Sequence, residues 1–348
     1  MRHLAIVAPE CGSISHSVKE AFASLGWSVT LLQYGPANDP SPSTKLYRLF
    51  DRDSYYEEAC AKEFNKTLRM DLRQLMEGVD VDALLFLKGH RLDPDNKSLL
   101  QRTRCSKVAW AIDSLERAPA QKEIFEFCDL VFVIDGWDAE CFHPSAQWLP
   151  LGVDEHIYRP RKNKNLDVLA IGTLGPRYLY RQHQVLNLCR SNPLQSWKIG
   201  FIGSTGNRIS DWRLSLGFRA KWIAPRLPES ELATQIASAR ICVNILQDDG
   251  RRPVNPAFFS IAAAGTCQVV DGRPYLAEWL RPYDDYIPFQ EGGLVNTIEA
   301  LLNDQPMVER VALTGHLKVT SAHTFVCRAR GILTQLESRG HGADKGQR

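Results

Sequence analysis

Glycine and arginine follow an apolar run in the segment "GTLGPRYLYR". It supplies Gly172, Thr173, Arg177 and Arg181, with the arginines at or near the start of a helix-like stretch. Helix N-termini and guanidinium groups both bind phosphate oxygens, so the segment fits a diphosphate. The alternative is a helix-entry loop with solvated arginines. The glycine spacing is not G-x-G-x-x-G, so no dinucleotide fingerprint is present.

Two further glycine segments could border the same ligand. "FIGSTGN" contains Gly203, and "VNPAFFSIAAAGTCQVVD" contains Asn255, Ser260, Gly265 and Thr266. The second segment predicts a helix whose N-terminal dipole favours an anion, followed by a glycine that lets the backbone approach a ligand. The alternatives are a simple chain turn for the first segment and a surface turn before a packing helix for the second.

The N-terminal half places polar residues after several apolar runs. Gly12 and Ser13 follow the first run, Lys88 follows "LLFL", and Asp113 follows "VAWAI". Because the carboxyl ends of parallel strands share one edge of a sheet, we expect these residues to line a substrate site. Asp113 is the predicted catalytic residue, since an aspartate there can act as a base or hold a sugar hydroxyl. A helix-capping role for Asp113 is equally open.

The sequence predicts no metal site. The Asp-x-Asp pairs "DRD" at 51–53 and "DPD" at 93–95 do not end buried strands, and no C-x-x-C or H-E-x-x-H occurs. P-loop and G-x-S-x-G patterns are also missing from the sequence.

Composition sets the broad class of the protein. The chain has 348 residues, and 42 Lys plus Arg against 40 Asp plus Glu give a net charge of +2, which provides no overall field for nucleic acid or an acidic membrane. The 9 cysteines are scattered singly, and the apolar start is too short for a signal peptide or a membrane span. We therefore expect a protein of the reducing cytoplasm without a transmembrane segment.

The elements that must position these residues alternate between apolar strands and helices. This rhythm predicts an α/β fold with two Rossmann-like, doubly wound domains facing a central cleft. The polar segment "EHIYRPRKNKN" marks the boundary between domains at 1–155 and 156–320. A C-terminal helix at 321–337 is expected near the domain junction, and 338–348 is expected to be a disordered tail.

Several of these segments resemble the CgeB-like glycosyltransferases, relatives of the retaining glycosyl transferases group 1 with the GT-B fold. The match runs from about residue 80 to 336. "IGTLGPRYLYRQHQVLNL" matches with Arg181, and "HTFVCRARGIL" echoes H-T-Y-x-x-R-A with His323 and Arg328. "NPAFFSIAAAGTCQVVD" stands where the family has N-P-R-x-F-E-x-A-A-C-G, so Ala257 and Ser260 replace the family's arginine and glutamate.

The resemblance implies a metal-independent, retaining hexosyltransferase without a cofactor. The N-terminal domain would bind the acceptor, and the C-terminal domain would bind a nucleotide-diphosphate-sugar such as a UDP-sugar. In relatives, the glutamate at the position of Ser260 would hold the ribose of the nucleotide-sugar. The acceptor could be a glycan, a protein, a lipid or a modified nucleic acid.

Two other functions stay open. One is a degenerate glycosyltransferase-fold protein that binds a nucleotide or a partner without catalysis. Ala257 and Ser260, which replace the family's arginine and glutamate, favour this alternative. The other is a nucleotide-sugar epimerase of two Rossmann domains, which would need a pair of acids where only Asp113 is convincing.

Overall fold

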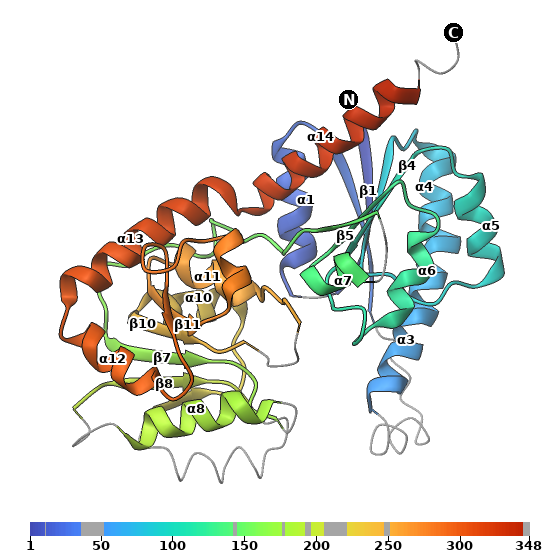
Figure 1. The fold of residues 1–348 in the computed structure, drawn as a ribbon. Coiled ribbons are helices and arrows are strands. Elements are labelled where there is room, and N and C mark those ends of the chain that lie inside the picture. Colours follow the sequence, from blue (N-terminus) through green and yellow to red (C-terminus); the bar gives the residue numbers. More distant parts are fainter. Residues whose placement is uncertain are drawn as a thin grey trace. The chain divides into compact units, whose positions relative to one another are not determined.

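Two units, each with its own six-stranded parallel sheet, make up the chain (Figure 1). The first unit combines Met1–Leu151 with Arg328–Arg348, and the second is Gly152–Cys327. The computed structural model describes residues 1–10, 12–35, 52–141, 145–175, 178–191, 196–204, 221–246 and 251–343, without the side chains of 52–56, 221–222 and 340–343. The prediction of an α/β protein with two Rossmann-like sheets is confirmed.

The sheet of the first unit has the strand order β2-β1-β3-β4-β5-β6. Its strands are β1 (His3–Pro9), β2 (Ser28–Tyr34), β3 (Ala83–Leu87), β4 (Ser106–Ala111), β5 (Leu130–Val133) and β6 (Ala146–Trp148). The uninterrupted apolar run of β3 is buried at every position, as expected for a parallel strand covered on both faces. The chain reverses its direction across the sheet between β1 and β3, and this reversal is the topological switch point of the unit.

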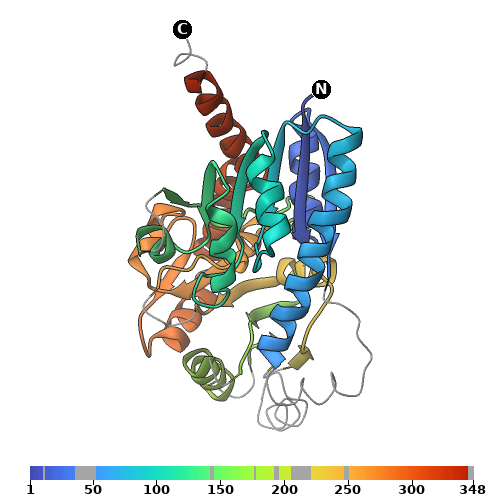
Figure 2. The ribbon, with the colours of Figure 1, turned by 90° about the vertical axis from the view of Figure 1, so that its right-hand side faces the viewer.

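Helices cover the first sheet. They are α1 (Ile14–Ser24), α3 (Arg52–Thr67), α4 (Arg73–Gly78), α5 (Pro94–Arg102), α6 (Lys122–Phe125) and α7 (Gly136–Cys141), with a short 3-10 turn at Pro119–Gln121. A π-helical turn at Leu68–Leu72 joins α3 to α4, so the predicted helix at 54–77 is one continuous rod (Figure 2). Its Leu68 and Leu72 are fully buried in the core of this unit, as their helical spacing predicts.

The second sheet has the order β12-β11-β10-β7-β8-β9. Its strands are β7 (Leu166–Ile171), β8 (Ile199–Ile202), β9 (Lys221–Ala224), β10 (Ala239–Asn244), β11 (Cys267–Asp271) and β12 (Ile287–Phe289). Here the chain reverses its direction between β7 and β10, so the loops after these two strands border the switch point.

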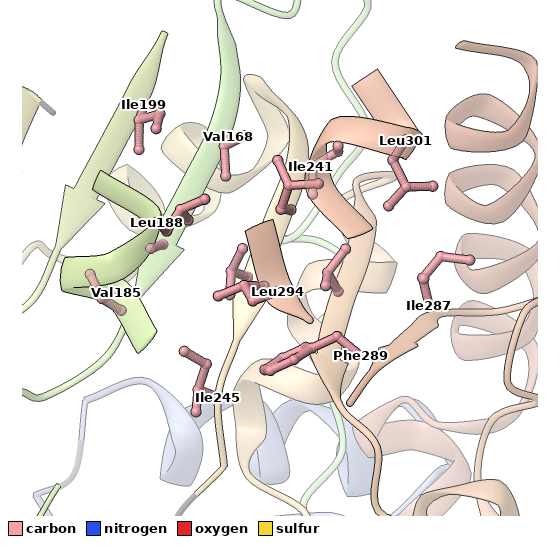
Figure 3. Close-up of a cluster of buried hydrophobic side chains, with 14 of the residues drawn as sticks. Val168, Val185, Leu188, Ile199, Ile241, Ile245, Ile287, Phe289, Leu294 and Leu301 are labelled. Carbon is pink, nitrogen blue, oxygen red and sulfur yellow. The ribbon is translucent and has the colours of Figure 1, made fainter. Parts of the chain in front are cut away.

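Two layers of helices enclose the second sheet. They are α8 (Leu179–Arg190), α10 (Glu229–Ala237), α11 (Pro256–Ala263), α12 (Leu294–Leu302) and α13 (Gln305–Ala322), with a 3-10 segment at Pro274–Glu278. Figure 3 shows the core on one face, where Val168 and Ile241 of the sheet lie among Leu188 of α8 and Leu294 of α12. The sheet is therefore held rigidly beneath the loops at its carboxyl edge.

Two C-terminal helices differ from the sequence prediction. Helix α13 was not predicted, and α14 runs over Phe325–Ala343, so it begins later than 321 and includes residues 338–343. Helix α14 packs on the first unit, because Gln335 and Gln147 exchange side-chain hydrogen bonds of 2.7 and 2.8 Å and Arg2 pairs with Glu337 at 2.9 Å. These contacts explain why residues from Arg328 onward group with the first unit.

Candidate functional sites

Arg181 bridges the two loops at the switch point of the second unit. Its Nε donates to the carbonyl of Ile245 at 2.8 Å, and an Nη donates to the carbonyl of Thr173 at 3.0 Å. Ile245 follows β10 and Thr173 follows β7, while the guanidinium also lies 4.8 Å from the ring centre of Tyr178. The predicted phosphate-binding arginine therefore stands where open α/β sheets bind ligands.

Gly172 and Gly203 are needed for the close approach of these loops. A Cβ on Gly203 would lie 2.0 Å from the carbonyl oxygen of Gly172, and a Cβ on Gly172 would lie 3.0 Å from Cδ of Arg181. Gly172 also has a φ of +135°, a backbone angle that residues with a Cβ rarely adopt. Leu174 N donates to the Ser204 carbonyl at 2.8 Å, so the turns after β7 and β8 form one backbone layer beside Arg181.

Asn255 caps helix α11. Its Oδ1 accepts from the amide of Phe258 at 3.1 Å, and its side-chain amide exchanges hydrogen bonds of 2.8 and 3.0 Å with Asn244 at the end of β10. This pair fixes the N-terminus of α11 at the carboxyl edge of the sheet. Asn255 thus positions the helix dipole and has its own side chain engaged by the protein.

Asp271 and Arg273 add an ion pair to the same edge. Asp271 accepts from the amide of Leu246 at 2.7 Å and from Nε of Arg273 at 2.7 Å. Sequence reasoning did not select Arg273, although a cation two residues beyond a buried strand was a usable signal.

Ser260 lies within α11 and is buried, with 7% of its surface exposed. It hydrogen-bonds to the buried phenol of Tyr158, which also bonds to Glu229 at the start of α10. Burial, followed by the nearby Glu229 carboxylate, raises the pKa of Tyr158 well above its ordinary value. The serine that stands in place of the family's glutamate is thus part of an internal hydrogen-bonded chain.

Gly265 and Thr266 do not join this site. Helix α11 runs antiparallel to the strands, so its C-terminal end and the start of β11 lie at the amino edge of the sheet, opposite Arg181. Gly265 has a φ of +63° and ends the helix, while the Thr266 hydroxyl donates to the Ile236 carbonyl at 2.8 Å. The placement of these two residues beside Arg181 was wrong, because a helix carries its two ends to opposite edges of the sheet.

Lys164 binds backbone carbonyl groups beside Gly265. Its ammonium donates to the carbonyls of Ala237 and Gly265 at 2.8 and 2.9 Å, at the C-terminal ends of α10 and α11. Burial lowers the pKa of Lys164 to about 8. This lysine satisfies helix carbonyls and supports a structural role for the amino edge.

Lys88 lies between two carboxylates at the carboxyl edge of the first sheet. Its Nζ is 3.0 Å from Asp113 and 3.3 Å from Glu57, and only 11% of its side chain is exposed. Lys88 also has a φ of +64°, a backbone conformation that costs energy in a residue with a Cβ and that clusters at functional sites. The structure thus brings Lys88 and Asp113 together, as predicted, and adds Glu57 from α3.

The charges of this cluster support one another. Burial alone would lower the pKa of Lys88, but the Asp113 and Glu57 carboxylates outweigh it and raise that pKa. A hydrogen bond from His90, opposed by burial and assisted by Lys88, lowers the pKa of Glu57. Sequence reasoning missed Glu57, because nothing along the chain relates a helix at 52–67 to the end of β3.

The remaining predicted residues fall in three groups. Gly12, with a φ of +57°, and Ser13, which precedes α1, lie at the carboxyl end of β1 beside the switch point of the first unit. Arg177 lies outside the described residues. His323 stacks on Phe259 at 4.7 Å and Arg328 donates to the Pro150 carbonyl at 2.8 Å, so both support the backbone of their own unit.

The described residues contain neither a candidate metal-binding cluster nor a helix that could span a membrane. No group of three or more His, Cys, Asp or Glu side chains has an arrangement that could hold a metal ion. None of the helices in the described part of the chain is long and apolar enough to cross a membrane.

Comparisons with known proteins agree with the fold. Residues 183–334 match a family described as Glycosyl transferase-like. A search of curated proteins gave no match.

The similar solved structures span nearly the whole chain. Sucrose-phosphate synthase from Thermosynechococcus elongatus has 14% identity and a TM-score of 0.67, covering 99% of this chain and 100% of that one. HepE of Anabaena in complex with UDP and glucose has 13% identity and a TM-score of 0.65, covering 97% and 100%. An alpha-glucosyltransferase in complex with UDP has 15% identity and a TM-score of 0.63, covering 93% and 96%.

These observations define the class of protein. The chain has the GT-B fold of glycosyltransferases, with two parallel Rossmann-like sheets. The segment from 183 to 334, within which α11 and α13 lie, is similar in sequence to glycosyl transferases.

Proposed function

We propose that this protein is a glycosyltransferase that moves a sugar from a nucleotide-diphosphate-sugar to an acceptor hydroxyl. The second unit binds the donor and the first unit binds the acceptor. The observation that carries the proposal is the guanidinium of Arg181, held at the switch point of the second sheet by the carbonyls of Thr173 and Ile245. The neighbours in complex with UDP support a uridine nucleotide as the donor.

Donor activation relies on fixed dipoles and cations. As the glycosidic bond to the diphosphate breaks, negative charge grows on the departing phosphate. Arg181, the amides of the turns at Gly172 and Gly203, and the N-terminus of α11 stabilise that charge without rearranging. Arg273, held by Asp271, is a further cation at this edge. We include metal independence in the proposal because these groups supply positive charge.

Acceptor activation falls to the first unit. Asp113 accepts the proton of the acceptor hydroxyl, and Lys88, 3.0 Å from its carboxylate, orients that carboxylate. Gly12 and Ser13 are proposed to contact the acceptor from the end of β1. Hexosyl transfer with retention of configuration, kinship with the CgeB-like group and a cytoplasmic location complete the proposal. The described cysteines are all unbridged, which supports a reducing compartment.

Thermal shift with UDP, GDP, TDP and their sugars tests donor binding. A ligand that binds only the native state adds about 2.7 kcal/mol of stability at one hundred times its Kd. We expect the largest shift with UDP or a UDP-sugar, followed by sugar release or transfer in a product assay. If no nucleotide or nucleotide-sugar raises the unfolding temperature, the proposal is rejected.

A non-catalytic nucleotide-binding protein is the second candidate. It is favoured by Ala257 and by Ser260, whose hydroxyl is engaged with Tyr158 inside the unit. This candidate predicts the same UDP shift but no turnover of any UDP-sugar, so the product assay separates the two functions.

A further inference from the structure

Lys88 is a largely buried lysine with two carboxylate partners. Its Nζ lies 3.0 Å from Asp113 and 3.3 Å from Glu57, and 11% of its side chain is exposed. The side chains of Asp113 and Glu57 are 40% and 36% exposed, so the acids border solvent while the ammonium is mostly enclosed. The charge of Lys88 depends on these carboxylates, because an unpaired buried ammonium is strongly unfavourable.

The backbone of Lys88 is fixed by two other strands of the sheet. Its amide donates to the Trp110 carbonyl of β4 at 3.0 Å, and its carbonyl accepts from the hydroxyl of Tyr34, the last residue of β2, at 3.3 Å. These contacts hold Lys88 at its φ of +64°, a conformation that costs free energy and persists only where the surroundings enforce it. The base of the Lys88 side chain is therefore fixed beside the two acids.

The carboxylate of Glu57 is divided between two partners. Its Oε1 lies 3.3 Å from Nζ of Lys88, and its Oε2 lies 3.2 Å from Nδ1 of His90. His90 is buried, and its ring packs against Tyr34 and Phe64 at centroid distances of 5.4 and 5.6 Å. The contact with His90 lowers the pKa of Glu57, so this carboxylate stays ionised at neutral pH. Glu57 is thereby a fixed negative charge beside Lys88 that does not depend on Asp113.

Proton uptake by Asp113 changes the charges around Lys88. In the proposed reaction the acceptor oxygen forms its bond to the anomeric carbon, and the bond to the diphosphate breaks with its electron pair leaving on the phosphate oxygen. The acceptor proton passes to the Asp113 carboxylate, which loses its charge. Lys88 would then be a buried ammonium without a carboxylate, were it not for Glu57 at 3.3 Å.

We propose that Glu57 is a positioning residue of the transfer reaction. It holds the ammonium of Lys88 and supplies the counter-charge that lets Asp113 alternate between its ionised and protonated forms. A structural ion pair needs one carboxylate, whereas one ammonium between two carboxylates leaves a net negative charge that can take up a proton. The inference rests on the proposed function, in which Asp113 accepts the proton, and Glu57 acts through Lys88 without taking the proton itself.

A double-mutant cycle on the whole chain tests the shared ammonium without a substrate. Asp113→Asn mimics the protonated aspartate, since the amide is neutral and has the same shape. We expect Asp113→Asn and Glu57→Gln each to raise the equilibrium constant of urea unfolding by less than about fivefold, and the double variant to raise it by about tenfold or more beyond their product. The coupling arises because only the double variant leaves the ammonium of Lys88 without a carboxylate.

Two controls locate the coupling. In a Lys88→Met chain the same two substitutions should be additive, since no buried ammonium remains. Glu58→Gln, at the exposed neighbouring position on α3, should be additive with Asp113→Asn when Lys88 is present.

Turnover links this charge arrangement to the reaction. The probe is UDP-glucose with water as the acceptor, followed by the release of UDP and glucose, and the donor panel described above replaces it if another sugar gives more product. Glu57→Gln should lower kcat by about tenfold to hundredfold with UDP affinity unchanged. Glu57→Asp keeps the charge and should retain more of the rate. A merely structural role would lower stability but leave the kcat of the folded protein unchanged.

Coupling in the cycle together with the reduced kcat supports the inference. An additive cycle, or a wild-type kcat in folded Glu57→Gln, overturns it and leaves the proposed function standing. A wild-type chain that gives no product from any UDP-sugar rejects the proposed function and this role with it, even where the cycle is coupled. UDP titration of the same samples shows in each case whether donor binding is retained.

Discussion

Replacing Arg181 with alanine should both destabilise the second unit and weaken nucleotide binding. The substitution removes two charge-assisted hydrogen bonds, at 2.8 and 3.0 Å, and the contact with Tyr178. Hydrogen bonds that involve a charged group contribute about 1.5–3 kcal/mol each. Arg181 is half-buried and water can reach part of the vacated space, so we expect a total loss of about 2–4 kcal/mol. In a domain of this size that loss lowers the unfolding temperature by about 5–15 °C.

Nucleotide affinity supplies the second half of this test. Calorimetry of UDP with Arg181→Ala should show no measurable binding at concentrations that saturate the wild type. Arg181→Lys is the matched variant, since it keeps the charge but cannot reach both carbonyls in a fork, and it should retain weak binding. Wild-type UDP affinity in folded Arg181→Ala would refute the phosphate role. An unchanged unfolding temperature would refute the reasoning about the two carbonyls.

Three further predictions concern single residues. Asp113→Asn should abolish sugar transfer while UDP affinity stays at the wild-type value, as steady-state rates and calorimetry will show; full activity would remove Asp113 from catalysis. Folding lowers the pKa of Glu57 below 4.5, so the stability that its ionised form contributes is lost as the pH falls through that lowered pKa. Folding raises the pKa of Lys88 above 10.5, so the stability from its charged form is lost as the pH rises through that raised pKa. Urea unfolding across acidic pH should therefore show a shallower acid decline for Glu57→Gln than for the wild type, and parallel curves would contradict the linkage. Gly203→Ala should destabilise by about 1–3 kcal/mol or more, because its Cβ would lie 2.0 Å from the Gly172 carbonyl, whereas Gly78→Ala, with no atom within 4 Å, should be near neutral in the same thermal melts.

The positions of the strands could be predicted from the sequence because buried parallel strands consist of short, uninterrupted apolar runs. The run "LLFL" at β3 and the small-residue helix before β11 were placed from local pattern alone. Helix α13 was not predicted because Gly315 and several β-branched residues weaken the helical pattern of its sequence. The Gly315 position is explained by packing, since a Cβ there would lie 2.6 Å from the carbonyl of Asp285. Asp304 followed by Gln-Pro was an available start signal, and the Asp304 side chain does accept from the amide of Met307.

Residues of the candidate sites were harder to place because their contacts are long-range. Lys88 and Asp113 were grouped correctly, because two neighbouring parallel strands end at one edge. Glu57 could not be foreseen, since its contacts with Lys88 and His90 depend on how α3 packs across the sheet. Gly265 and Thr266 were placed at the wrong edge although the strand–helix–strand order of β10, α11 and β11 was sufficient to locate them.

Hydrogen–deuterium exchange with and without UDP tests the central claim most directly, since it reports which backbone amides a nucleotide covers. The account predicts slowed exchange in peptides that contain Gly172–Leu174, Ile245 and the first turn of α11, with no change around Gly265 and Thr266. Protection at Gly265 and Thr266 without protection at the ends of β7 and β10 would contradict it.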